Sequence, residues 1–178
     1  MGTPLSESLA AGDPEAFTAL YDRLAVRLLG AARTMLATPV DAEDVVQDVF
    51  VELARGRARL AAVTDLEAYV FTMLRHAVHR RGRRAAIDRR AVVASAAGRR
   101  ATGAGVAAAA ELPDDELAAA VAALPEAQRE VVALKIDGGL TFAEIAAVTG
   151  TSLNTAASRY RYALEKLRAA LADREDET

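Results

Sequence analysis

The residues best able to make specific contacts lie in the segment 151–168, TSLNTAASRYRYALEKLR. Its hydroxyl, amide, guanidinium and phenol groups can all form hydrogen bonds. Asn and Arg can each make two parallel hydrogen bonds to a base edge of DNA, Asn to adenine and Arg to guanine. The segment is therefore either a surface that reads DNA or the polar exterior of an ordinary bundle helix.

A helical projection of this segment separates two faces. Spacing by three or four predicts a core-facing stripe of Leu153, Ala156 or Ala157, Tyr160, Leu164, Leu167 and Leu171. The opposite face carries short polar groups at its N-terminal end, which is where the second helix of a helix-turn-helix docks onto DNA. We predict that the DNA-binding residues are Asn154, Thr155, Ser158, Arg159, Arg161 and Tyr162.

The preceding segment, LTFAEIAAVTG, has the features expected of the first helix of such a motif. Thr141 and Glu144 have the spacing of a capping box. Ala146 is small where two helices must cross closely. Gly150 can adopt the positive φ that a tight turn requires.

The N-terminal half contains two helices of opposite charge. In DAEDVVQDVFVELAR the valines form one side, and the acidic side predicts a basic protein partner; its residues are Asp44, Gln47, Asp48 and Glu52. The next helix, LEAYVFTMLRHAVHRRGRR, is basic with aromatic residues at its start, which suits phosphates and unpaired bases. His76 and His79 lie three apart, but no further ligand accompanies them, so we predict no metal site.

Local signals predict an all-α fold. Asp13 is a candidate N-cap before Pro14, and Thr64 with Glu67 has capping-box spacing at the start of a later helix. Residues 91–110 are rich in Ala and Gly. We therefore predict two small helical domains, residues 1–85 and 112–178, joined by a flexible linker over 86–111.

Composition narrows the function classes. The chain of 178 residues contains no cysteine, which excludes disulfides and thiolate zinc sites. Its start lacks the pattern of a secretory signal, and no apolar run is long enough to insert into a membrane. No catalytic constellation or phosphate-binding glycine loop is evident. We expect a cytoplasmic protein that is not an enzyme and needs no cofactor.

These motifs, in this order, resemble the extracytoplasmic-function (group IV) sigma factors of bacterial RNA polymerase. The resemblance depends on DAEDVVQDVFVELAR, then LEAYVFTMLRHAVHRRGRR, then LPEAQREVVALKIDGGLTFAEIAAVTGTSLNTAASRYRYALEKLR. It implies a region 2 domain, a linker and a region 4 domain that contains the helix-turn-helix.

The resemblance also implies partners. The acidic helix would dock on the β′ clamp helices of core RNA polymerase, and the last helix would read the -35 element of promoter DNA. The basic helix would hold the -10 element through Tyr69, Arg75, His76, His79, Arg80 and Arg81. The β flap would meet region 4 around Val131, Leu134 and Lys135. Family members are commonly held by an anti-sigma factor.

Two alternatives stay open from the residues alone. A free-standing dimeric helix-turn-helix regulator would bind DNA without polymerase, although it leaves the acidic helix without a role. A small metal-dependent nuclease would use His76 and His79.

Overall fold

The computed structural model describes the backbone of residues 5–96 and 113–175 and the side chains within 5–87 and 116–172. Over these ranges every regular element is helical, which confirms the predicted fold class. The elements are α1 (Leu5–Ala11), α2 (Pro14–Met35), α3 (Pro39–Arg55), the 3₁₀ helix η1 (Arg57–Ala62), α4 (Leu66–Ala96), α5 (Pro113–Ala122), α6 (Glu126–Ile136), α7 (Phe142–Thr149) and α8 (Leu153–Glu175).

Helix α4 continues to Ala96, past residue 86, where the predicted linker begins. The remainder of that linker, from residue 97, lies outside the described residues, so the domain boundaries stay a prediction. Among the helices of the described ranges, none combines the length and the apolar content that crossing a membrane requires.

The start of α2 agrees with its sequence signals, whereas the start of α4 differs. Asp13 accepts a hydrogen bond from the Glu15 amide at 3.0 Å and caps α2. The predicted capping box of Thr64 and Glu67 is wrong, because Asp65 accepts from the Ala68 amide at 2.9 Å. Thr and Asp are both good N-caps. Because Thr64 and Asp65 are adjacent, the sequence alone does not determine which of them caps α4. Glu67 is thereby free to contact α2.

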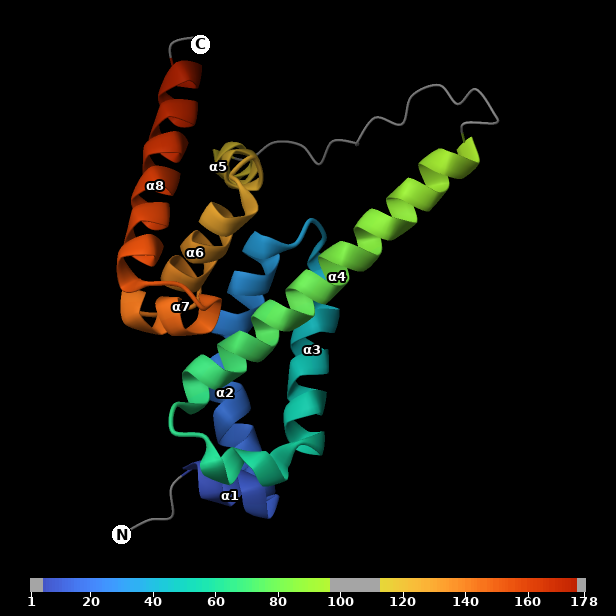
Figure 1. Ribbon diagram of the computed structural model, residues 1–178, viewed down its shortest axis with the longest axis vertical. Coiled ribbons are helices and arrows are strands. Elements are labelled where there is room, and N and C mark those ends of the chain that lie inside the picture. Colours follow the sequence, from blue (N-terminus) through green and yellow to red (C-terminus); the bar gives the residue numbers. More distant parts are fainter. Residues whose placement is uncertain (1–4, 97–112, 176–178) are drawn as a thin grey trace.

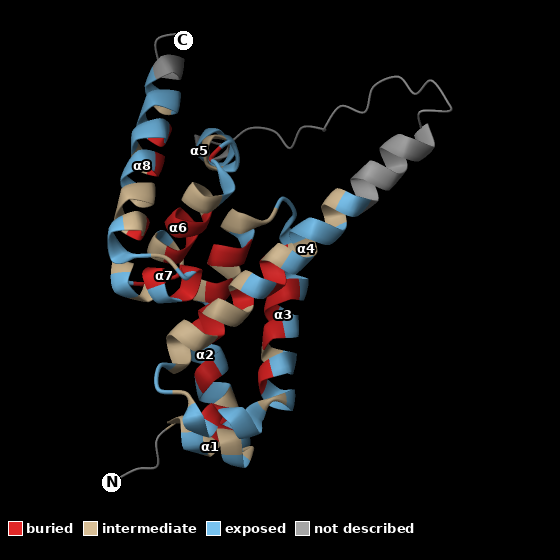
Figure 2. Ribbon diagram, viewed as in Figure 1, coloured by how far each residue is buried: buried red, intermediate tan, exposed pale blue. Residues whose placement is uncertain are grey.

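The two halves of the chain pack together around α2. Helix α6 packs against α2, and α7 contacts α4 (Figure 1). Buried residues from α1 through α4 and from α6 through α8 form one contiguous cluster, seen as the band of buried segments in Figure 2. Three leucines of α2, Leu20, Leu24 and Leu28, are fully buried within it. The domains predicted to be joined only by a linker therefore share a core.

The turn from α6 to α7 shows how closely the halves approach. Gly138 is buried, and a Cβ atom there would lie 2.5 Å from the Leu134 carbonyl oxygen and 3.1 Å from the Phe71 ring of α4. A distance of 2.5 Å to a backbone atom cannot be relieved by rotating a side chain. Glycine is therefore required where the turn between α6 and α7 touches α4.

Replacement of this glycine should destabilise the protein. We expect Gly138→Ala to lower the free energy of unfolding by about 1–3 kcal/mol, which is typical of overpacking. Gly82→Ala is the matched control, because a Cβ atom at that exposed position of α4 meets nothing within 4 Å. It should raise stability by about 0.5–1 kcal/mol, since alanine is the better helix former. Urea unfolding measures both, and equal stability of the two variants would contradict the described packing.

Candidate nucleic-acid and polymerase interfaces

Helices α7 and α8 form the predicted helix-turn-helix. Thr141 and Glu144 make the complete capping box at the start of α7, with the Thr141 amide 2.6 Å from the Glu144 carboxylate. These hydrogen bonds from the Thr141 side chain and backbone hold the pKa of Glu144 below its usual value. Gly150 ends α7 with φ of 67°. Ser152 then caps α8 by accepting from the Thr155 amide at 3.0 Å, so both helix starts are fixed by side chains.

The polar face of α8 is available at the surface, as predicted. Asn154, Arg161 and Tyr162 are exposed, and the other three predicted -35 residues are partly exposed. The two tyrosines separate as expected: Tyr160 packs edge-on against Phe142, with ring centroids 5.6 Å apart, whereas Tyr162 is 48% exposed. The Arg161 guanidinium lies 5.0 Å from the centre of the Tyr162 ring.

One residue of the predicted core stripe is misplaced. Leu153 is 51% exposed, whereas Ala163, which the stripe omitted, is fully buried. Leu153 is the first residue of α8 and precedes the point where α8 meets its neighbours. Helical spacing predicts which side of a helix a residue lies on, but it does not predict whether a neighbouring helix extends far enough to bury that residue.

The acidic side of α3 faces solvent. All four predicted polymerase-docking residues are exposed. Two of them already contact α4: Asp44 lies 3.3 Å from Arg81, and Glu52 lies 3.5 Å from Arg80. Within the described side chains, Asp48 has no hydrogen-bond or ion-pair partner.

Arg81 is held chiefly by Asp41, at the start of α3. Its guanidinium Nε donates to Asp41 at 2.7 Å, and a second nitrogen contacts the same oxygen. Hydrogen bonding with Thr38 and with Arg81 holds the pKa of Asp41 below its usual value, and Asp41 in turn raises the pKa of Arg81. Part of the basic charge of α4 is thus neutralised by α3.

Further along α4, two predicted -10 residues contact α6. Arg75 Nε donates to Glu130 of α6 at 2.7 Å, and His79 Nε2 lies 3.0 Å from the same carboxylate oxygen. The other ring nitrogen of His79 lies 3.0 Å from Glu126. We call these four residues the α4–α6 ion cluster. Arg75, His79 and Glu126 of this cluster line a polar hollow of about 590 Å³, together with His76, Arg80 and Arg83.

Two family models match the chain, one in its N-terminal half and the other in its C-terminal half. Residues 20–87 match Sigma-70 region 2, and residues 114–167 match Sigma-70 region 4. The ECF RNA polymerase sigma factor SigK of Mycobacterium ulcerans is 30% identical over 178 residues, covering 92% of this chain and 90% of that protein. The chain belongs to the ECF sigma factor family. As a sigma factor, it directs transcription initiation by RNA polymerase.

Other relatives agree with this assignment. The ECF RNA polymerase sigma factor RpoE of Cereibacter sphaeroides is 50% identical over 52 residues, which are 29% of each chain. The structure of CnrH in complex with the cytosolic domain of CnrY has a TM-score of 0.62 and 30% identity, and covers 95% of this chain and 96% of CnrH. The sigma factor RpoE bound to the anti-sigma factor NepR from Bartonella quintana shares the fold, with a TM-score of 0.64, 24% identity, and coverage of 87% and 97%.

The structure places the predicted -10 residues of this sigma factor along the first half of α4, but not on one open face. His76 and Arg80 are exposed. Tyr69 packs against the shared core. Arg75 and His79 belong to the α4–α6 ion cluster, and Arg81 is paired with α3. In this arrangement the six side chains do not form a single nucleic-acid surface.

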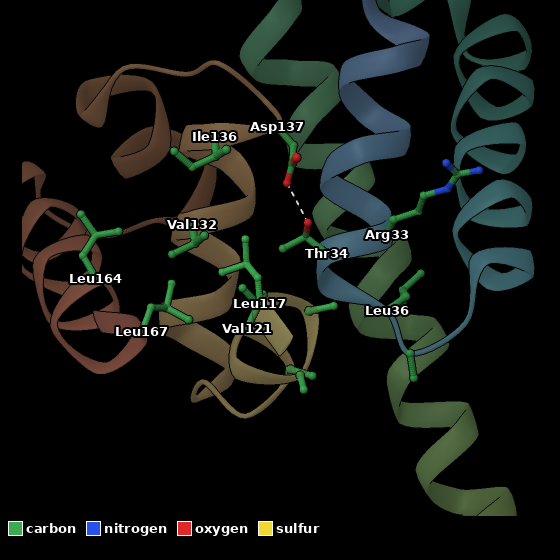
Figure 3. Close-up of a pocket in the computed structure, with 14 residues that line it drawn as sticks. Arg33, Thr34, Leu36, Leu117, Val121, Val132, Ile136, Asp137, Leu164 and Leu167 are labelled. Atoms are coloured by element: carbon green, nitrogen blue, oxygen red, sulfur yellow. Dashed lines mark hydrogen bonds between the residues drawn. The ribbon is translucent and has the colours of Figure 1, made fainter. Parts of the chain in front are cut away.

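Two of the three residues predicted to meet the β flap are not accessible. Val131 and Leu134 are fully buried in the shared core, and Lys135 donates to the Leu140 carbonyl at 2.9 Å. Another side of region 4 carries an apolar groove of about 740 Å³ (Figure 3). Its apolar lining comes from Leu117 and Val121 of α5, Val132 and Ile136 of α6, and Leu164 and Leu167 of α8 on one side, and from Leu36 and Ala37, which follow α2, on the other.

Sequence reasoning missed the residues that join the halves, although signals for them were present. Glu130 lies four residues before the buried Leu134 and therefore falls on an apolar stripe. Asp137 follows the last residue of α6, where the helix dipole disfavours an acid. Its partner is Thr34 of α2, whose hydroxyl donates to the Asp137 carboxylate at 2.7 Å.

The cap that orients α7 can be tested. We expect Thr141→Ala to lower the free energy of unfolding by about 1 kcal/mol, because the N-cap hydrogen bond and the hydroxyl contact with Glu144 are lost together. Thr64→Ala is the matched control: Thr64 has cap-like sequence context, but Asp65 performs the capping. That variant should stay within about 0.5 kcal/mol of the parent. Thermal or urea unfolding compares them, and an equal loss in both would contradict the assignment of the caps.

Proposed function

We propose that this sigma factor binds core polymerase through the acidic side of α3, reads the -35 element with α8, and holds the -10 strand on α4. The observation that carries the proposal is the exposed polar face at the start of α8, presented by a helix-turn-helix with capped helices. The protein acts as an initiation factor, catalyses no reaction itself, and works in the cytoplasm beside polymerase and DNA. It requires no cofactor for these contacts.

The reading of -35 DNA is assigned to the exposed end of α8. Asn154 and Arg161 have the donor groups for adenine and guanine edges, and Arg159 is placed to meet phosphate at the border of the face. The Arg161 side chain is 65% exposed, and its contact with Glu165, at 3.9 Å, is long. Only this weak contact with Glu165 has to be broken before Arg161 can contact a base.

Arg161→Ala should weaken promoter binding by the holoenzyme. If the arginine reads a base, we expect a loss of about 1–3 kcal/mol together with relaxed preference at one -35 position. If it contacts only phosphate, all sequences should weaken equally. Lys166→Ala is the control, an exposed cation more than one turn further along α8. Binding to a set of promoters with single -35 substitutions measures both effects, and unchanged affinity would contradict a role for Arg161.

The polymerase surface combines acids with apolar side chains. Beside Gln47, an apolar hollow of about 710 Å³ lies between α2 and α3. Three of its lining residues, Tyr21, Val26 and Val51, are exposed by 54%, 81% and 39%. An apolar patch rimmed by acids is typical of a protein interface. We therefore place the clamp helices across α3 and the edge of α2.

Asp48→Arg should weaken binding to core polymerase by about tenfold, which corresponds to about 1.4 kcal/mol. Asp48 is the residue of choice because Asp44 and Glu52 also contact α4. The control is Glu7→Arg, the same charge reversal on an exposed residue of α1. Titration of labelled core polymerase gives both affinities, and circular dichroism checks the fold. An affinity equal to that of the control would place the docking surface elsewhere.

The apolar groove of region 4 is the proposed site for the β flap, replacing the buried positions expected from the sequence. An anti-sigma factor is a further proposed partner, since CnrH, a structural neighbour at 30% identity, is held in complex with the cytosolic domain of CnrY.

In vitro transcription tests the whole proposal. Core polymerase with the purified protein should start RNA at discrete sites on genomic DNA from the host. A protein that binds DNA as a dimer and never binds core polymerase would instead support the free-standing regulator.

A further inference from the structure

Four large apolar side chains are exposed among the described side chains of α5 to α8, and three of them belong to surfaces already assigned. Leu117 and Ile136 line the apolar groove, and Tyr162 lies among the predicted -35 residues. The fourth, Leu153, is 51% exposed at the first position of α8. Single exposed leucines are common on protein surfaces, so its role has to be judged from its position.

The start of α8 does not use Leu153 to stabilise the helix. Ser152 is the cap: it accepts from the Thr155 amide at 3.0 Å, and its hydroxyl lies 2.8 Å from the Thr155 hydroxyl. The first turn of a helix favours acidic side chains because of the helix dipole, yet Glu165 is the first acidic residue of α8. A helix that begins without acids is suited to approach DNA phosphates.

Leu153 lies on the same side of α8 as an arginine that is proposed to read a base. Leu153, Ala157 and Arg161 follow one another at intervals of four residues, and such residues are neighbours along one side of a helix. Ala157 is partly exposed and Arg161 is exposed. This side of α8 therefore presents two apolar groups, followed by a guanidinium. The apolar groups are at the N-terminal end, which is the end that contacts base edges in a helix-turn-helix.

An apolar side chain in the major groove distinguishes one base from the others. Of the four bases, only thymine presents a methyl group there, at its C5 atom, and apolar side chains recognise it by direct contact. Leucine offers the same kind of contact as the alanine and phenylalanine side chains that serve this purpose elsewhere. The short side chain of Ala157 leaves space beside Leu153 in which a methyl group fits.

We propose that Leu153 is a specificity-determining residue that packs against the C5-methyl group of a thymine in the -35 element. The eight residues from Leu153 to Arg161 span about 12 Å of helix, and base pairs are about 3.4 Å apart. The thymine therefore lies within about four base pairs of the base that Arg161 contacts. This inference rests on the proposed function of α8.

Deoxyuridine tests the contact, because it differs from thymidine only in lacking the methyl group. The probe is a promoter at which the parent holoenzyme starts RNA in vitro, with each -35 thymine of either strand replaced in turn. We expect one replacement to weaken binding of the parent holoenzyme about fourfold, which corresponds to about 0.8 kcal/mol for one buried methyl group. Leu153→Ala should bind the thymine promoter at least about fourfold more weakly than the parent, with no further loss on the deoxyuridine promoter. This comparison is a double-mutant cycle between one side chain and one methyl group.

Two further variants separate the methyl contact from a general loss of affinity. Leu153→Met keeps an apolar side chain of similar volume and should still distinguish thymine from deoxyuridine. Leu171→Ala removes a partly exposed leucine near the other end of α8 and should show the same loss on deoxyuridine as the parent. Circular dichroism checks that each variant is folded.

The outcomes that overturn the proposal are specific. A loss on deoxyuridine that is equal in the parent and in Leu153→Ala would show that another residue contacts the methyl group. A parent holoenzyme that is insensitive to deoxyuridine at every -35 position would show that no methyl group is read. Arg161→Ala on the same promoters tests the proposed function separately: if only this variant weakens binding, α8 reads the -35 element without Leu153. If neither Arg161→Ala nor Leu153→Ala weakens binding, the assignment of α8 to the -35 element is itself wrong.

Discussion

One side chain, Arg27, holds the junction on which the arrangement of the two halves depends. Its guanidinium donates to the Gly138 carbonyl at the end of α6 and to the Glu67 carboxylate at the start of α4. It also lies 5.5 Å from the centre of the Phe71 ring. Burial by itself raises the pKa of Glu67, yet hydrogen bonds from Arg27 and Arg23 bring that pKa below its usual value. Arg27 therefore joins α2, α4 and the turn after α6.

The consequences of this junction differ for the two DNA elements. The start of α8 points its polar side chains to solvent because α7 and α8 pack against each other and each helix begins at its own side-chain cap. The middle of α4 is covered because α6 is fixed to α2. In this packing the residues predicted to bind the -10 strand are partly covered, whereas those predicted to read the -35 element stay at the surface. A protein built as two independent domains would not couple these surfaces.

How much the sequence predicted depends on the range of the interaction. Asp13, the box of Thr141 and Glu144, and Gly150 act within a few residues, and the sequence predicted all of them. The contacts of Glu130, Asp137 and Arg27 join residues 55, 103 and 111 positions apart, and no local pattern specifies such partners. Even within a few residues the prediction failed once, because Thr64 was predicted to cap α4 and Asp65 does so. The family resemblance supplied the roles of α3, α4 and α8, but not the conformation that covers α4.

The distribution of charge explains how α4 can be strongly basic while the whole chain has a net charge of -3. Its arginines are paired twice, with Asp41 and Asp44 of α3 on one side and with Glu130 of α6 on another. The first set of pairs lies within region 2. The second joins α4 to region 4. Acidic side chains of both halves therefore compensate the positive charge of α4.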